Sequence, residues 1–259
     1  FAFDGDGVQL GAPPPALDVV KWYNAPPLRL EDFEGKALII DVFRTWCGPC
    51  NAMVPSLNEE NDEAAETGLY VIAVTTEREE LVDEWVRQRK PEYPVAILRD
   101  KTLDKALGVK GYPTLGVVGP DGNLTYAGYR SKSSGPIRKA KEAASPGEIF
   151  PAKKLSKPIK LMADGKVSKS YAAALQLVKK SADDPSVAPW ALRFQEFFEG
   201  LASSALEEAR ETANEGGLVY RAMQIAEPYA KAKPPYPSSE ATRAFLDEIW
   251  LPPRHDWTI

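Results

Sequence analysis

The sequence predicts an α/β fold, in which a central mixed β-sheet is flanked by helices, followed by a small all-α region. Two observations carry this prediction. Short apolar runs alternate with amphipathic helical patterns over the first half of the chain, and a β-hairpin pattern closes that half. From about Pro146 onward, almost every segment has a helical pattern. We therefore expect a first domain with an N-terminal extension over 1–145, a linker over 146–160 and a helical domain over 161–259.

The first half of the chain supplies the elements of the sheet. Short runs rich in Val, Ile and Leu predict buried strands, and amphipathic stretches predict helices. The predicted strands cover 37–43, 69–74, 94–98, 114–118 and 124–129, and the predicted helices cover 50–67, 79–90 and 103–107. Gly68 stands where a helix C-cap is expected. Residues 1–27 contain Gly and Pro clusters and are expected to form loops.

The second half contains two weakly similar stretches, 165–185 and 216–237. Each begins near Gly, continues as an Ala-rich amphipathic helix and ends at Pro. This outline fits two helical-hairpin units of the tetratricopeptide kind, and it fits an unrelated small helical bundle equally well. Four aromatic residues at helical spacing are expected to belong to the core of this region rather than to a ligand site, namely Trp190, Phe194, Phe197 and Phe198.

Composition excludes several classes of function. The formal charge of −5 and the absence of a basic run argue against nucleic-acid binding. The two cysteines and the single histidine, His255, are too few for a structural zinc site, and this histidine is remote from the cysteines. We therefore expect no metal and no cofactor beyond a cysteine pair. Because the chain begins at Phe1 rather than Met, we expect that a signal peptide, lipoprotein anchor or tag preceded it.

The cysteines predict redox chemistry. They occur in the motif Trp46-Cys47-Gly48-Pro49-Cys50, at a predicted strand-to-helix junction that puts the first sulfur at a helix N-terminus. A thiol pKa lowered from ~8.5 toward ~7 would make about half of it thiolate at neutral pH, and the thiolate is the nucleophile of disulfide exchange. Pro49 suits the first helical turn, and Trp46 would shield one side of the pair. A static disulfide is less expected, because so short a loop gains little closure entropy.

Over residues 10–134 the chain resembles the thioredoxin superfamily. Asp41 stands six residues before Cys47, where thioredoxins have a buried acid. The resemblance implies that Asp41 accepts or relays the proton of Cys50, and burial would raise the pKa of such a carboxyl. An Asp hydrogen-bonded at a strand end is the other interpretation.

The segment Tyr112-Pro113-Thr114 resembles the cis-proline loop of the same superfamily. This resemblance implies that Pro113 is cis and that the backbone of Tyr112 binds an extended substrate segment. An ordinary turn is the alternative. Arg44, between the predicted strand and the cysteines, would either lower the pKa of Cys47 or point to solvent.

Two further motifs are similar to the TlpA/ResA-type branch of exported or membrane-anchored thiol–disulfide oxidoreductases. They are the Gly-Ala-Pro-Pro opening at 11–14 and the Leu-x-x-Phe-x-Gly-Lys pattern at 30–36. The resemblance implies a location outside the cytoplasm, periplasmic or membrane-anchored. Three features depart from known patterns: Met53 replaces a common Glu, Asp41 replaces a common Asn, and 69–76 lacks the Lys that thioredoxins pair with their Asp.

These features predict an enzyme, a thiol–disulfide oxidoreductase that reduces protein disulfides through a mixed disulfide. Its expected partners are protein thiol or disulfide substrates and an upstream thiol reductant. The alternative is a redox sensor or adaptor whose helical domain recruits a specific partner. A peroxidase is not expected, because the Pro-x-x-x-Thr-x-x-Cys pattern is absent although Thr45 precedes the cysteines.

Overall fold

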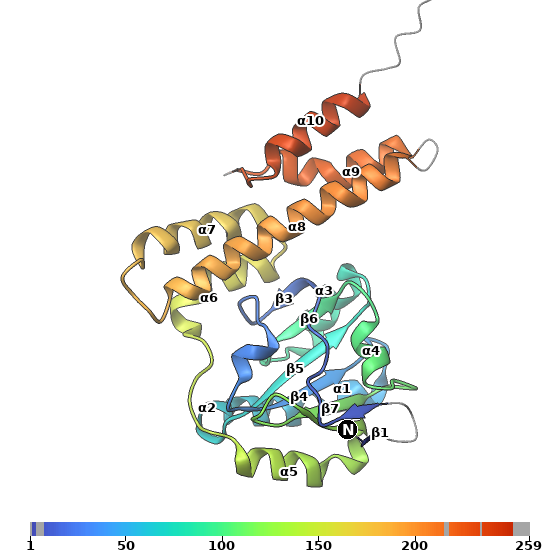
Figure 1. The fold of residues 1–259 in the computed structure, drawn as a ribbon, viewed down its shortest axis with the longest axis vertical. Helices are drawn as coiled ribbons and strands as arrows, with labels where there is room; N and C mark the ends of the chain where they lie inside the picture. Colours follow the sequence, from blue (N-terminus) through green and yellow to red (C-terminus); the bar gives the residue numbers. More distant parts are fainter. Residues whose placement is uncertain (1, 4–7, 215–217, 234, 251–259) are drawn as a thin grey trace, which may run out of the picture. The chain divides into compact units, whose positions relative to one another are not determined.

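The computed structural model describes residues 2–3, 8–214, 218–233 and 235–250. Its contacts divide the chain into two compact units, Phe1–Ala163 and Asp164–Ile259, which are described separately (Figure 1). His255 lies outside the described residues, as do Gly216 and Gly217 at the start of the second predicted helical stretch.

The first unit contains a six-stranded sheet in the order β3-β6-β5-β4-β7-β8. Its strands are β3 (Val19–Tyr23), β4 (Ala37–Val42), β5 (Leu69–Thr75), β6 (Val95–Leu98), β7 (Thr114–Val118) and β8 (Leu124–Tyr129). β4, β5 and β6 run parallel, whereas β3, β7 and β8 run antiparallel to their neighbours. The five predicted strands are confirmed as β4 to β8, and β4, β5, β6 and β7 are buried along their whole length.

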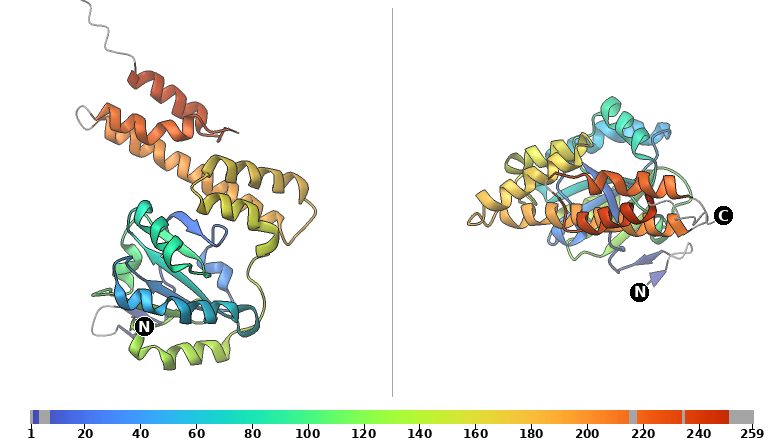
Figure 2. Two further views of the ribbon diagram at one scale, coloured as in Figure 1. Left: turned by 180° about the vertical axis from the view of Figure 1, so that it is seen from behind. Right: turned by 90° about the horizontal axis from the view of Figure 1, so that it is seen from above.

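Helices flank this sheet (Figure 2). They are α1 (Gly48–Asp62), α2 (Ala64–Thr67), α3 (Glu79–Arg89), α4 (Thr102–Ala106), α5 (Ser134–Ala143) and α6 (Ala152–Ala163), with 3-10 turns η1 (Leu30–Phe33) and η2 (Arg130–Lys132). Ile39 of β4 shares one core cluster with Leu57 of α1, Trp85 of α3 and Ile137 of α5. A mixed sheet with helices on its faces is the thioredoxin fold, so the predicted fold class is confirmed.

The expectation of loops over residues 1–27 is wrong for three short segments. β3 forms one edge of the main sheet, and β1 (Ala2–Phe3) pairs with β2 (Gln9–Leu10) as a separate ribbon. The charged Lys21 interrupts the apolar pattern of β3, so the sequence pattern does not predict this strand. In the structure Lys21 is only 5% exposed, and its ammonium binds Glu79 at 2.8 Å and Asp83 at 2.7 Å, both on α3.

The linker expected over residues 146–160 contains most of α6. This helix contacts β3, and the division between the units falls after Ala163. Leu155, Ile159 and Met162 recur at helical spacing and are buried, which explains why a segment with proline at 158 is nevertheless packed against the sheet.

The second unit is all-α, as predicted. Its helices are α7 (Val167–Lys180), α8 (Ala188–Asn214), α9 (Val219–Ala230) and α10 (Ser239–Trp250), and each contacts the next along the chain. Of the four aromatic residues expected in the core, Phe194 and Phe198 of α8 are buried, whereas Trp190 and Phe197 are only partly buried. Whether these helices form tetratricopeptide-like units stays a prediction. No helix in the described part of the chain is long and apolar enough to cross a membrane.

Candidate active site at the cysteine pair

The structure joins Cys47 and Cys50 in a disulfide at the start of α1. Cys47 is the N-cap residue, and its Sγ accepts a hydrogen bond from the backbone N–H of Cys50 at 3.1 Å. Gly48 and Pro49 occupy the first helical turn, where the missing N–H of proline leaves no bond unmade. The sulfur of Cys47 therefore lies at the positive end of the helix dipole, which favours a thiolate there.

Access to the cysteine pair is narrow. The exposed fractions of Cys47 and Cys50 are 3% and 1%, whereas Trp46 beside them is 72% exposed. The indole of Trp46 contacts the ring of Tyr112 edge to face, with 5.9 Å between ring centroids. The exposed Trp46 and the half-buried Tyr112 thus form an aromatic pair beside the cysteines.

The loop before the cysteines is held by polar contacts. The backbone N–H and the hydroxyl of Thr45 donate to the carboxylate of Glu77, at 2.6 and 3.0 Å. Asn51 of α1 donates to the carbonyl of Thr45 at 3.1 Å, and its amide oxygen accepts from the indole of Trp85 at 2.6 Å. Sequence reasoning missed the roles of Glu77, Asn51 and Trp85 in holding this loop. An acid three residues after the end of the predicted strand at 69–74 was the available signal for Glu77, because β4 and β5 are parallel and end at the same edge.

The predicted proline loop lies beside the cysteine loop. The Tyr112–Pro113 peptide bond is cis. Thr114 follows as the first residue of β7 and pairs with Val42, the last residue of β4. The hydroxyl of Thr114 is buried and donates to the carbonyl of Gly111 at 2.8 Å. The structure thus brings together the two predicted parts of the site, although the substrate-binding roles of Tyr112, Pro113 and Thr114 remain predictions.

Arg44 does not point to solvent. Its side chain is buried, and its guanidinium lies over the ring of Tyr112 with 4.4 Å to the centroid. It forms an ion pair of 3.1 Å with Asp104. It also donates to Thr75 and Thr76 at 3.2 and 3.1 Å. Arg44 therefore connects the cysteine loop to the proline loop and to α4, and an effect on Cys47 stays a prediction.

Removing this guanidinium is expected to destabilise the fold. Arg44→Met leaves the carboxylate of Asp104 buried without its charge partner, which should lower the free energy of unfolding by about 3 kcal/mol. Adding Asp104→Asn removes the stranded charge and should restore part of the loss. Urea denaturation of the single and double variants measures both effects. If the single and the double variant lost the same free energy of unfolding, the loss would not come from the broken charge pair.

Asp41 is buried on the face of the sheet that carries the cysteine pair. It stands between Ile39 and Phe43, and both of these share the core cluster of Cys50, so the two-residue alternation of the strand turns Asp41 to the same side. Burial raises the pKa of this carboxyl from 3.8 to about 7, while the guanidinium of Arg130 acts in the opposite direction. A group with a pKa near neutrality can both accept and release a proton at neutral pH.

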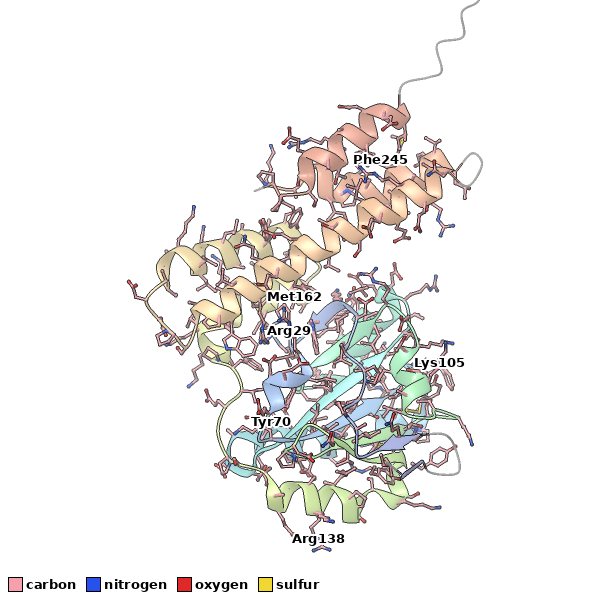
Figure 3. All side chains as sticks on the ribbon, viewed as in Figure 1. Arg29, Tyr70, Lys105, Arg138, Met162 and Phe245 are labelled. Atoms are coloured by element: carbon pink, nitrogen blue, oxygen red, sulfur yellow. A yellow bond between two sulfur atoms is a disulfide. The ribbon has the colours of Figure 1, made fainter. Side chains whose placement is uncertain are left out.

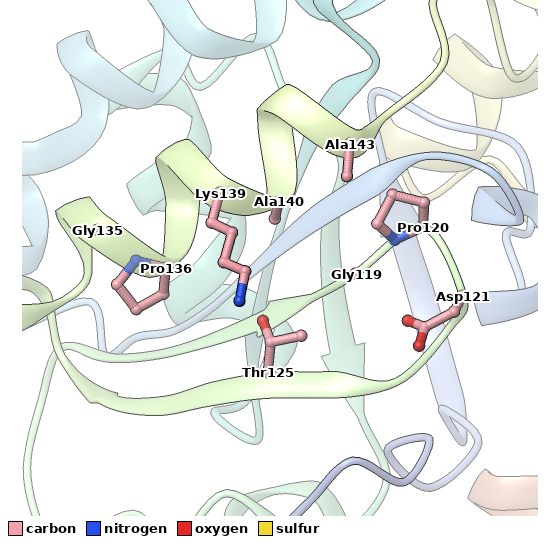
Figure 4. Close-up of a pocket in the computed structure, with 9 residues that line it drawn as sticks. All are labelled: Gly119, Pro120, Asp121, Thr125, Gly135, Pro136, Lys139, Ala140 and Ala143. Carbon is pink, nitrogen blue, oxygen red and sulfur yellow. The ribbon is translucent and has the colours of Figure 1, made fainter.

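A separate cavity of about 600 Å³ lies between the β7–β8 turn and α5 (Figure 4). The Lys139 side chain points from α5 toward the hairpin, and Asp121 and Thr125 line the opposite side. None of the site residues predicted from the sequence lines this cavity. It is therefore not part of the cysteine site.

This architecture places the chain in the class of thioredoxin-fold proteins that carry a cysteine pair at the start of a helix. Residues 12–127 match the model of the AhpC/TSA family. The matched residues include both cysteines, so this part of the chain is similar to that family.

Curated relatives of this domain are thiol-disulfide oxidoreductases named ResA. The protein of Bacillus thuringiensis subsp. konkukian is 31% identical over 107 residues, which are 41% of this chain and 62% of that protein. The protein of Bacillus anthracis is 29% identical over 125 residues, 48% of this chain and 72% of that protein. The predicted resemblance to the TlpA/ResA-type branch is confirmed. The chain spans about 62% of the length of the first of these relatives.

Solved structures with a similar fold include two thioredoxin-like proteins. One is a thiol:disulfide interchange protein of the thioredoxin family from Chlorobium tepidum TLS, with 22% identity and a TM-score of 0.43 over 52% of this chain and 99% of that one. The other is the thioredoxin domain of a thiol-disulfide oxidoreductase from Bacteroides vulgatus, with 21% identity and a TM-score of 0.44 over 51% of this chain and 97% of that one.

Proposed function

We propose that this protein is a thiol–disulfide oxidoreductase that reduces disulfides of protein substrates. The observation that carries the proposal is the Cys47–Cys50 pair at the N-terminus of α1, beside the loop of Tyr112 and Pro113. The names of the curated relatives support the same activity.

In the first step, the thiolate of reduced Cys47 attacks one sulfur of the substrate disulfide. The substrate S–S bond breaks, a mixed disulfide forms between Cys47 and the substrate, and the other substrate sulfur leaves as a thiolate. The N-terminal end of α1 favours the attacking thiolate.

In the second step, Cys50 resolves the mixed disulfide. The thiol of Cys50 gives its proton to the carboxylate of Asp41, and the resulting thiolate attacks the sulfur of Cys47. The bond from Cys47 to the substrate breaks, and the second substrate sulfur leaves as a thiolate. The products are the Cys47–Cys50 disulfide and a substrate reduced by two electrons, so an upstream dithiol reductant must regenerate the pair.

The surroundings of the cysteines suit an extended protein segment. The exposed indole of Trp46 and the ring of Tyr112 offer apolar contact, and the backbone of Tyr112 offers strand-like hydrogen bonds. By resemblance to the ResA branch, we also infer that the protein works outside the cytoplasm, in the periplasm or anchored at a membrane surface.

The reduction potential of the Cys47–Cys50 pair tests the proposal. The protein is equilibrated with dithiothreitol or glutathione buffers, and the fraction of free thiols is quantified; Cys47→Ser is the control that cannot form the disulfide. A value of about −250 mV or lower is expected for a reductase. A value above about −150 mV would identify an oxidant or isomerase instead, and a pair that does not exchange would refute the activity.

A further inference from the structure

The sheet gives the buried carboxyl of Asp41 no polar partner. Its neighbours in register are Ala73 of β5 and Leu115 of β7, both apolar and fully buried. β5 consists of the residues LYVIAVT and contributes no cation. A charged carboxylate in such surroundings is costly unless an opposite charge compensates it.

The opposite charge comes from beyond β8. Leu115 pairs with Gly128 of β8, so Asp41, Leu115 and Gly128 form one row across the sheet and present the same face. Arg130 stands two residues after Gly128, at the start of η2. Its positive charge acts on Asp41 and lowers the pKa of the carboxyl against the effect of burial.

Asp41 and the two groups that interact with it electrostatically each have a buried polar atom without a hydrogen-bond partner within the described part of the chain. These atoms are Oδ1 of Asp41, Nη1 of Arg130 and the hydroxyl of Tyr93. The charge of Asp41 adds to burial in raising the pKa of Tyr93, so these two groups also interact electrostatically. No hydrogen bond among the described residues therefore engages these three atoms.

Arg130 also borders a cavity of about 280 Å³ between α1 and α5. The other lining residues are Glu60, Ser133, Ser134, Ile137, Arg138 and Lys141. Arg138 is exposed, whereas Lys141 forms ion pairs with Glu60 and Glu63 at 3.7 and 3.3 Å. Arg130 is thus the one lining residue of this cavity whose charge acts on Asp41.

We propose that Arg130 is a positioning residue of the resolving step, whose guanidinium keeps Asp41 available as the carboxylate that takes the proton of Cys50. The proposal rests on the proposed exchange activity. The proton moves from the Cys50 thiol to Asp41, the Cys50 thiolate attacks Cys47, and the neutral carboxyl later returns the proton to water. Cys50 of α1 belongs to the core cluster on the same face of the sheet as Asp41. The titratable groups that interact with the charge of Asp41 are Tyr93, in the loop before β6, and Arg130 of η2.

Three variants test the proposal. Arg130→Gln removes the charge, and Arg130→Lys keeps it. Arg138→Gln is the matched control, because Arg138 lines the same cavity but is 75% exposed, pairs with Glu142 and lies on the outer side of α5 (Figure 3). Carbon-13 NMR of labelled aspartate follows the Asp41 carboxyl in the oxidised full chain. Stopped-flow kinetics follows resolution of a preformed mixed disulfide as a function of pH.

The wild-type carboxyl is expected to titrate near pH 7. In Arg130→Gln the titration midpoint of Asp41 should rise by about one pH unit. At pH values below the wild-type midpoint, the rate of resolution should then fall about tenfold, because about tenfold less of Asp41 is a carboxylate. Arg130→Lys and Arg138→Gln should stay close to wild type. A wild-type midpoint and pH profile in Arg130→Gln would overturn the proposal. If the wild-type protein itself does not exchange disulfides, the proposed function fails, and the NMR titration still decides whether Arg130 acts on Asp41.

Discussion

A Cys50→Ser protein is expected to accumulate as a covalent mixed disulfide with its substrate. Cys47 can still attack, since its sulfur keeps its place at the N-terminus of α1, but no second thiol remains to break the new bond. Multiple-turnover reduction should fall by on the order of 10³-fold or more, because nucleophile and resolving group act as one unit. Non-reducing gels and intact-mass spectrometry measure the adduct.

The matched variant Cys47→Ser separates the two sulfurs. It is expected to lose turnover to the same extent and to form no adduct, because Cys50 is 1% exposed and lies inside the first turn of the helix. An adduct in Cys47→Ser and none in Cys50→Ser would show that the two roles are reversed.

Asp41→Asn is expected to stabilise the oxidised protein at alkaline pH. The folded pKa of Asp41 is about 7 and its ordinary value is 3.8, so between these values the folded state holds a proton that the unfolded state has released. The stability that the neutral carboxyl contributes is therefore lost as pH rises toward 7. Above pH 7 the wild-type protein carries the full cost of burying the charged carboxylate. Over this window the cost is on the order of 4 kcal/mol. An Asn side chain does not titrate and avoids this cost.

The difference between Asp41→Asn and wild type should grow by on the order of 3 kcal/mol from pH 5 to pH 8. Urea denaturation at the two pH values measures it. Asp62→Asn, an exposed change of the same kind near the end of α1, is the control and should show no such growth. A constant difference between wild type and Asp41→Asn would mean that the carboxyl does not titrate near neutrality.

Local patterns were sufficient for most of the first unit. The apolar runs of β4 and β5 and the hairpin of β7 and β8 predicted those strands, because buried strands need continuous or alternating apolar residues. The motif around Cys47 and Cys50 was likewise local, and its place at a strand-to-helix junction followed from the flanking patterns.

The polar partners of the site could not be predicted in the same way. Glu77 and Asp104 contact the cysteine loop and Arg130 acts on Asp41 from three separate parts of the chain, and only the fold of the sheet brings them together. Arg44 was equally compatible with solvent and with burial until Asp104 was placed beside it. α6 was taken for a linker because proline at 158 obscured its apolar face.

The buried lysine of β3 has a consequence for how the sheet meets other chains. An edge strand with unpaired backbone groups invites intermolecular strand pairing and aggregation, and an inward charge is one natural protection against it. Lys21 supplies that charge on one edge, and at the other edge the backbone of Leu124 is already bonded to Gly11 and Ala12. Both edges of the sheet thus carry some protection against strand pairing, and the loop at Tyr112 stays the proposed place at which an extended substrate segment binds.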